Sequence, residues 1–539
     1  MSDALIWFFA AGQLALALVG LMPKGLLSAP ETVAQRARYA ALLALVLALA
    51  ALGLVLVKGS CHTPMAAGYA GLQFDSLSSS IEVLVAFIGV IVVSYSHNYL
   101  AGDPRHADFL KRLCLTLAAV LHLIVAQSLP QFALAWIATS LCLHRLLVFY
   151  GERQPAVLAA RKKFVVARLS DAALVGAFLI LAHLFGSMDI ARILAAASSR
   201  VPAASSGALD LAALLLALAA LLKSAQFPMH GWLLEVMETP TPVSALLHAG
   251  IINAGGFLVL RFAPVFAHAA GALDLLLVVG GITALFGGLV MLTQTSIKVS
   301  LAYSTIGQMG FMMLECGLGA FAAAWIHIIG HSLYKAHAFL SAGSGVTRKG
   351  RNAANQPRRT PTPLGYAIGL SLGAVIVVGI GTVFGFSPLT APGMLVLAGV
   401  TVLSLTQLFS AAAPSFSPAL FARLVIRACF LAVAVFALEA AAARLLAPTL
   451  PAFLPLRGPF EAVSALLILA GFAIALLIQN SAVDAPHSRT LKALHAHLAN
   501  GLYVNTLANR WAITLWPGAA PPPRVTPPQS LSLRSGDAV

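Results

Sequence analysis

The sequence predicts an all-α, polytopic membrane protein with about 15 transmembrane helices, and three observations lead to this fold class. Of the 539 residues, 60% are hydrophobic and only 9% are charged, and the mean hydropathy is +0.91. An average soluble domain carries about 25% charged residues, so a water-soluble globular protein is excluded. A helix crosses the hydrocarbon core with ~20 apolar residues, and this length therefore accommodates roughly fifteen spans with short connections.

Fifteen apolar runs follow one another along the chain. The first extends from Ala4 to about Leu21. No basic segment precedes it and a second run follows, which indicates a span rather than a cleavable leader. The other expected spans lie at about 38–57, 80–100, 112–128, 130–150, 167–186, 208–225, 242–264, 273–293, 299–318, 321–343, 363–388, 393–411, 421–446 and 460–479.

The basic residues predict the orientation of the chain. When the runs are numbered in order, 17 Lys and Arg lie in the connections after odd-numbered runs. The connections after even-numbered runs hold five, namely Lys58, Arg192, Arg200, Arg261 and Arg457. Because Lys and Arg collect in cytoplasmic loops, we expect the amino terminus outside and the carboxyl terminus in the cytoplasm. The same rule explains the net charge of +15 without a nucleic-acid partner.

Two segments are predicted to lie outside the bilayer. Residues 344–363 are basic, polar and rich in turn-forming residues, which is typical of a cytoplasmic loop. The tail from Pro517 onward is rich in Pro and Ser and favours an extended or disordered state.

Ionisable residues inside apolar runs are the first candidates for function, since a charge at the bilayer centre costs ~2.5–3.5 kcal/mol or more. In the run WIHIIGHSLYKAHAFL, His327, His331 and Lys335 follow at i, i+4 and i+8 and share one helical face. Titratable groups at ~6 Å steps along a helix form a plausible proton relay. The alternative is that these side chains hold helices together, or that Lys335 extends to the interface.

A second group surrounds a predicted helix break. Lys223 lies five residues before Pro228, which interrupts or kinks a helix, and broken helices at membrane depth are typical of ion sites in transporters. His230, Glu235, Glu238 and His248 follow. If Glu238 were close to Lys223, each charge would stabilise the ionised form of the other residue. Glu238 could equally be a carboxylate at the membrane interface.

No catalytic chemistry is expected within this chain. The five cysteines are scattered without a C-x-x-C pair, and we see no metal-ligand cluster, phosphate-binding loop or nucleophilic triad. The remaining ionisable groups in or near apolar runs lack partners at helical spacing, and we expect them to pack helices or lie at the interface: Glu82, His97, His122, His183, Glu315, Glu439 and Glu461.

Three stretches carry a family resemblance: KSAQFPMHGWLLEVMETPTPVSALLHAG, TSIKVSLAYSTIGQMGFM and HIIGHSLYKAHAFLSAGS. They resemble the antiporter-like subunits of respiratory complex I and of multisubunit sodium/proton antiporters, over about residues 70 to 345. The resemblance implies two inverted five-helix repeats, each with one broken helix. The domains would then be N-terminal helices at 1–111, repeats at 112–264 and 265–411, C-terminal helices at 412–480 and a cytoplasmic tail at 481–539.

The resemblance also implies roles for single residues. The proton relay would comprise Lys223, His248, Lys298, His327, His331 and Lys335. Possible modulators are Asp171, Arg168, Glu238 and His230. Two positions depart from the family. Ile137 stands where a buried glutamate would pair with the first lysine, and Pro388 stands where the second broken helix would carry a lysine or glutamate.

The signatures LLHAGIINAGGFLVLR and LHAHLANGLYVNTLANRW resemble one branch of this superfamily, the DabB membrane subunits of inorganic-carbon accumulation complexes. This resemblance implies a bacterial inner-membrane protein that conducts H⁺ or Na⁺. It also implies a large cytoplasmic partner, DabA, which resembles a carbonic anhydrase, holds zinc and forms bicarbonate from CO₂. No cofactor is expected in this chain.

Two alternatives remain open from the sequence. The chain could be a proton-translocating subunit of an NADH dehydrogenase-like complex or of a sodium/proton antiporter. It could also be a passive anchor whose buried charges only pack helices and recruit a partner.

Overall fold

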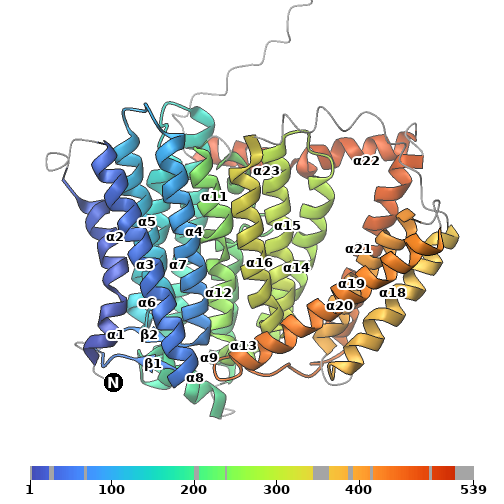
Figure 1. The fold of residues 1–539 in the computed structure, drawn as a ribbon, viewed down its shortest axis with the longest axis horizontal. Coiled ribbons are helices and arrows are strands. Elements are labelled where there is room, and N and C mark those ends of the chain that lie inside the picture. The colour runs from blue at the N-terminus through green and yellow to red at the C-terminus, as the bar shows by residue number, and fades with distance from the viewer. Residues whose placement is uncertain are drawn as a thin grey trace, which may run out of the picture.

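Helices make up most of the computed structural model of this chain (Figure 1). The structure describes residues 3–515 except for 24–29, 66–68, 200–205, 237–238, 344–362, 387–391, 413–416 and 485–487. Within this part, one short β-hairpin pairs β1 (Cys61–His62) with β2 (Gln73–Phe74) in antiparallel register. The mostly helical fold class is therefore confirmed.

The helices of the first half form the larger bundle in Figure 1. They are α1 (Asp3–Phe9), α2 (Ala11–Leu21), α3 (Pro30–Lys58), α4 (Ser76–Tyr99), α5 (His106–Ile124), α6 (Leu129–Leu147), α7 (Gln154–Phe185), α8 (Ile190–Ser199), α9 (Ser206–Lys223), α10 (Gly231–Glu235), α11 (Thr241–Ala249), η3 (Ile251–Asn253), α12 (Ala254–Arg261) and α13 (Ala263–Phe266).

The second half continues the bundle and then diverges from it. Its helices are α14 (Ala270–Met291), α15 (Ile297–Gly317), α16 (Phe321–Leu340), α18 (Pro363–Val383), α19 (Pro392–Ala412), α20 (Pro418–Leu446), α21 (Pro459–Asp484), α22 (Arg489–Ala499), η5 (Gly501–Tyr503) and α23 (Val504–Leu515). Figure 1 shows α18 to α21 as an inclined group beside α14 to α16, with α22 lying across the end of the molecule.

Each of the fifteen apolar runs coincides with one helix or with consecutive helices. Within the described residues, ten helical stretches are long and apolar enough to cross a membrane, for example 30–58 and 418–446. The chain is therefore a multi-span membrane protein, whereas the total of fifteen spans stays a prediction.

The predicted helix break after Lys223 is confirmed. Helix α9 ends at Lys223 and α10 begins at Gly231, with Pro228 between them. Ala225 adopts a positive φ of 50°, so the backbone turns sharply directly after the lysine. The hydroxyl of Ser224 donates to the carbonyl oxygen of Ile252 in η3 at 2.9 Å. This bond provides a partner for a backbone group in the interrupted segment between α11 and α12. The break thus places Lys223 at a helix end inside the bundle.

A buried ion pair joins α4 to α12. Asp75 caps α4 through the backbone N–H of Ser78 and receives the guanidinium of Arg261 at 2.5 and 3.3 Å. Both side chains are almost completely buried. The orientation count places Arg261 in a connection, but the structure places it at the end of α12, where Asp75 compensates its charge.

Helix α7 begins thirteen residues before the predicted run at 167–186, because Lys162 and Lys163 lower the hydropathy of its first turns without ending the helix. The Lys162 amine contacts the Glu235 carboxylate at 2.6 Å and the side-chain oxygens of Asn505 and Asn509 on α23. This cluster fastens the C-terminal helix to α7 and α10.

Several predicted features lie outside the described residues. They are Glu238, Pro388, nearly all of the 344–363 loop and the tail from Pro517 onward.

Helices α14 and α15 approach each other backbone to backbone. A Cβ atom added at Gly287 would come within 2.4 Å of the Gly307 nitrogen, and one added at Gly310 within 2.4 Å of the Ala284 nitrogen. Small residues at such contacts let membrane helices gain close van der Waals packing. This packing fixes the position of α15, which carries several of the candidate site residues.

We predict that Gly287→Ala destabilises the protein, whereas Gly288→Ala does not. The Gly287 substitution forces the two backbones apart, and overpacking of this kind typically costs ~1–3 kcal/mol. Gly288 has nothing within 4 Å of its added Cβ and is the matched control one residue away. Thermal unfolding in detergent measures the difference. Equal melting temperatures for the two variants would contradict the proposed contact.

Candidate functional site

Lys335 occupies the centre of the candidate site. It lies on α16 and is completely buried, although it carries an amine. Its Nζ donates to the carbonyl oxygen of Leu301 on α15 at 3.0 Å and lies 5.5 Å from the ring centre of Tyr334. Among the described residues, this lysine contacts neutral oxygen and aromatic groups rather than a carboxylate, and these contacts leave its charge uncompensated.

His331 connects α16 to α11. Its Nε2 donates to the backbone carbonyl oxygen of His248 at 3.2 Å, and both histidines are buried. The Nδ1 of His248 shares a hydrogen bond of 3.0 Å with the hydroxyl of Thr305 on α15. Three helices therefore meet through two imidazoles and one hydroxyl. The spacing of the stripe on α16 predicts the shared face, but it does not predict that His248 joins it.

The first histidine of the stripe has a carboxylate partner. The His327 Nδ1 lies 2.9 Å from the Glu315 Oε2, and both side chains are largely buried. The ring centres of His327 and His331 are 6.1 Å apart, one helical turn along α16. Helical spacing does not reveal this pair, because the partner of Glu315 lies on a neighbouring helix rather than on its own.

Lys223 is buried at the end of α9, as predicted, but its surroundings differ from a lysine–glutamate pair. Its Nζ lies 4.2 Å from the ring centre of Trp136 and donates to the Trp136 carbonyl oxygen at 3.3 Å. Within the described ranges no ion pair involves Lys223. The aromatic face and one carbonyl oxygen stand beside Ile137, where the resemblance implies an acid.

A second lysine shares the surroundings of Lys223 and was missed in the sequence. Lys163 and Lys223 both line a cavity of about 20 Å³ between α6, α7 and α9. The Lys163 amine donates to the carbonyl oxygen of Ser140 at 2.5 Å and to its hydroxyl at 2.8 Å. Two like charges so placed disfavour each other's charged form. Lys163 is not recognisable from the sequence, because its neighbours Arg161 and Lys162 give this stretch the polarity of a loop.

The three candidate modulators that the structure describes occupy two separate places. Arg168 and Asp171 pair on α7 at 2.6 Å, one turn apart. His230 is buried among Phe227, Phe286 and Tyr303, and its two ring nitrogens have no hydrogen-bond partner among the described residues. The fourth, Glu238, lies outside the described residues.

Lys298 lies at the edge of the group rather than inside it. It is partly exposed near the start of α15, and its Nζ donates to the Thr241 hydroxyl at 3.2 Å. Thr241 in turn donates to the Tyr99 hydroxyl at 3.4 Å. These contacts place Lys298 beside the first turn of α11, the helix that carries His248.

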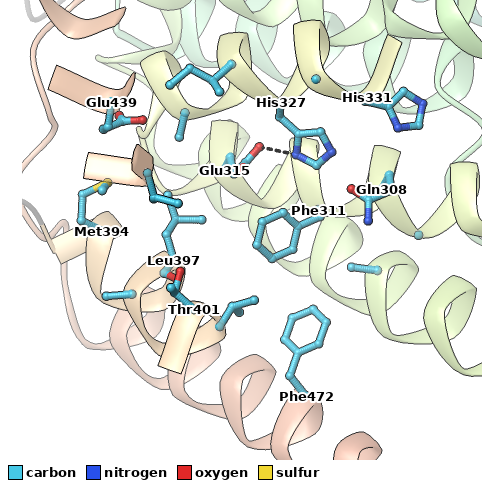
Figure 2. A pocket seen from close by; sticks show the side chains of 18 of the residues that line it. Gln308, Phe311, Glu315, His327, His331, Met394, Leu397, Thr401, Glu439 and Phe472 are labelled. Atoms are coloured by element: carbon cyan, nitrogen blue, oxygen red, sulfur yellow. Dashed lines mark hydrogen bonds and ion pairs between the residues drawn. The ribbon is translucent and has the colours of Figure 1, made fainter. Parts of the chain in front are cut away.

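A large cavity adjoins the histidines. It measures about 580 Å³ and is walled by residues of α14, α15, α16, α19, α20 and α21. Figure 2 shows His327, His331 and the Glu315 carboxylate in its wall, together with Glu439 from α20. Glu439 is another of the acids that we expected to pack helices or to lie at the interface. Its location in a shared cavity depends on tertiary structure that helical spacing cannot reveal.

Comparisons with known proteins agree with the resemblance. Residues 126–360 match the family described as NADH:quinone oxidoreductase/Mrp antiporter, TM. Residues 68–110 match the family described as NADH-Ubiquinone oxidoreductase (complex I), chain 5 N-terminus.

Two solved structures share the fold. A chain of the Mrp complex from Dietzia sp. DQ12-45-1b aligns with a TM-score of 0.64 and 26% identity, over 95% of this chain and 59% of that chain. A chain of the membrane-bound sulfane sulfur reductase, an archaeal respiratory membrane complex, aligns with a TM-score of 0.56 and 16% identity, over 94% and 99% of the two chains. The second likeness concerns the fold alone.

Among curated relatives, the probable inorganic carbon transporter subunit DabB2 of Halothiobacillus neapolitanus is 42% identical over 68% of this chain and 67% of its own length. The probable inorganic carbon transporter subunit DabB of Hydrogenovibrio crunogenus is 52% identical, over 49% of this chain and about half of its own length, 51%. The NADH-quinone oxidoreductase subunit L of Mycobacterium tuberculosis is 39% identical over 51% and 43% of the two lengths. The chain therefore belongs to the DabB family of inorganic carbon transporter subunits, within the antiporter-like superfamily of membrane proteins.

Proposed function

We propose that this chain conducts protons and thereby drives inorganic-carbon accumulation by a partner protein. The observation that carries the proposal is the buried group of Lys335, His331 and His248, held inside a chain of the DabB family. Buried ionisable residues in membrane proteins are retained mainly on ion and proton pathways, since they are costly to place there. The chain itself is proposed to be an ion-translocating subunit and not an enzyme.

The proposed path runs along the middle of the bundle. It begins at Lys223 on the broken helix, continues through His248 to His331, and reaches Lys335 and His327 on α16. Imidazole accepts a proton on one nitrogen while it releases another, and an amine releases a proton when its charge is not compensated. Lys298 would supply a proton from the edge of the bundle, where it is partly exposed.

Three groups would adjust the proton affinity of Lys223 in place of the glutamate that is absent at Ile137. The Arg168–Asp171 pair carries both charges on α7, and Lys163 lines the cavity that also holds Lys223. Protonation of one lysine disfavours protonation of the other, so a proton that arrives at this cavity is readily passed on. His230 and Glu238 complete the proposed set of modulators.

The partner is proposed to be DabA, a large cytoplasmic protein with a zinc site resembling that of a carbonic anhydrase. The chain would lie in the bacterial inner membrane with its amino terminus outside and its carboxyl terminus in the cytoplasm, as the distribution of Lys and Arg predicts. One proton that crosses 100 mV releases ~2.3 kcal/mol, which is sufficient to bias CO₂ hydration toward bicarbonate.

Replacing Lys223 or Lys335 with Met should abolish carbon accumulation, because Met keeps the length and apolar stem of lysine but carries no proton. We expect loss of labelled bicarbonate uptake, and loss of growth at ambient CO₂, in cells that depend on this protein. Lys58→Met is the matched control, because Lys58 is exposed at the end of α3. If both buried variants assemble with the partner and still accumulate carbon, the relay is wrong.

Purification of the tagged chain in mild detergent tests the proposed assembly. We expect one large partner in stoichiometric amount, with zinc detected by elemental analysis. A set of iron–sulfur and other dehydrogenase subunits would instead support the respiratory alternative. A Lys335→Met variant that still co-purifies with the partner distinguishes transport from passive anchoring. If the chain were only an anchor, this variant would keep carbon accumulation as well as partner binding.

A further inference from the structure

We propose that Glu439 on α20 is the terminal proton-binding residue of the relay, and that it exchanges protons with His327 through water in the cavity between them. This inference rests on the proposed proton conduction and assigns the end of the path. It also gives α20 a part in transport, although this helix lies in the inclined group outside the main bundle (Figure 1).

The cavity brings the relay and Glu439 to one space. His327 and His331 line it from α16, Glu315 lines it from α15 and Glu439 lines it from α20 (Figure 2). His331 belongs to both parts of the path, because it borders the cavity and donates to the His248 carbonyl oxygen. A proton on the α16 stripe therefore reaches the cavity without crossing another helix.

Unsatisfied polar atoms in the cavity wall point to a ligand that the protein itself does not supply. Glu439 is only 3% exposed, and its Oε1 has no hydrogen-bond partner among the described residues. The same holds for the Nε2 of His327. Buried polar groups in native proteins are almost always paired, with ordered water where protein groups are lacking. The volume of about 580 Å³ far exceeds the ~30 Å³ share of one water molecule.

The chemistry of the wall favours a proton over a coordinated metal ion. Within the described ranges, no three His, Cys, Asp or Glu side chains lie close enough to hold a metal. A carboxylate without a partner is costly in apolar surroundings, and proton uptake removes that cost because it removes the charge. Glu439 is thus suited to accept a proton and to release it only when water or a cation compensates the carboxylate.

The transfer is balanced and needs no other reactant. The Nε2–H bond of a doubly protonated His327 breaks, water carries the proton, and an O–H bond forms on the Glu439 carboxylate. The products are a neutral imidazole and a neutral carboxylic acid. Glu315 remains hydrogen-bonded to the Nδ1 of His327 at 2.9 Å and stabilises the imidazolium before transfer. The sequence contains no lysine between Lys349 and Lys492, so a lysine from this part of the chain cannot take the role.

Proton flux into proteoliposomes tests the proposal. The purified complex of the full chain with its partner is reconstituted with an internal pH dye, and a potassium diffusion potential drives uptake. Glu439→Gln keeps the shape of the side chain and should lower the flux at least tenfold, whereas Glu439→Asp should restore part of it. Thr401→Val removes a hydroxyl from the wall of the same cavity, where it donates to the Leu397 carbonyl oxygen of its own helix, and should leave the flux within twofold of the wild type.

The outcomes separate this inference from the proposed function. If Lys335→Met abolishes the flux and Glu439→Gln does not, the terminal role of Glu439 is wrong and the relay stands. If neither substitution changes the flux, the relay itself is wrong, and so is the terminal role of Glu439.

Chemical labelling provides a readout that does not require a folded variant. An apolar carbodiimide reacts with protonated carboxyls in apolar surroundings, and peptide mass spectrometry locates the product. We expect labelling of Glu439 in the wild-type complex, with loss of flux in proportion to the labelled fraction. Complete labelling without loss of flux, or no labelling of Glu439 at all, would overturn the proposal.

Discussion

The structure depends on one constraint, which is the cost of keeping ionisable side chains inside an apolar bundle. Each buried charge must find compensation or pass its proton on. The chain uses both solutions. Asp75 and Arg261 form a buried ion pair between residues that are 186 positions apart in sequence, and the pair joins α4 to α12. Lys223 and Lys335, in contrast, are held by carbonyl oxygens and aromatic rings. The paired charges stabilise the fold, and Lys223 and Lys335, which form no ion pair with any described carboxylate, are the lysines that we propose to carry protons.

Backbone geometry brings these lysines and histidines to their positions. The break after α9 places Lys223 at a helix end, and the interruption between α11 and α12 follows Ala249, the residue after His248. Asn253 in that interruption donates to the Ser332 hydroxyl on α16 at 2.8 Å, which ties the second break to the helix of the histidine stripe. The glycine contact packs α15 closely against α14, and α15 carries Thr305 and Glu315, which bond His248 and His327. Breaks and close approaches, rather than regular helices alone, assemble the site.

The sequence predicts the features that depend on local spacing. The apolar runs identify the helices, Pro228 identifies the break, and the interval of four residues identifies the face shared by His331 and Lys335. Features that depend on packing between distant helices are not predictable in this way. Glu315 meets His327 across two helices, and Glu439 reaches the cavity from α20. Lys163 could not be identified from the sequence for another reason. Its basic neighbours give this stretch the low hydropathy of a loop, although α7 continues through them.

The most direct test of the relay is the proton current of the reconstituted complex under an imposed potential, with sodium replaced by choline. If the relay conducts protons, the wild type and Lys58→Met carry equal currents without sodium, and Lys335→Met reduces the current to the level of empty vesicles. A current that needs sodium would make Na⁺ the coupling ion. An undiminished current in a fully assembled Lys335→Met complex would contradict proton conduction through Lys335.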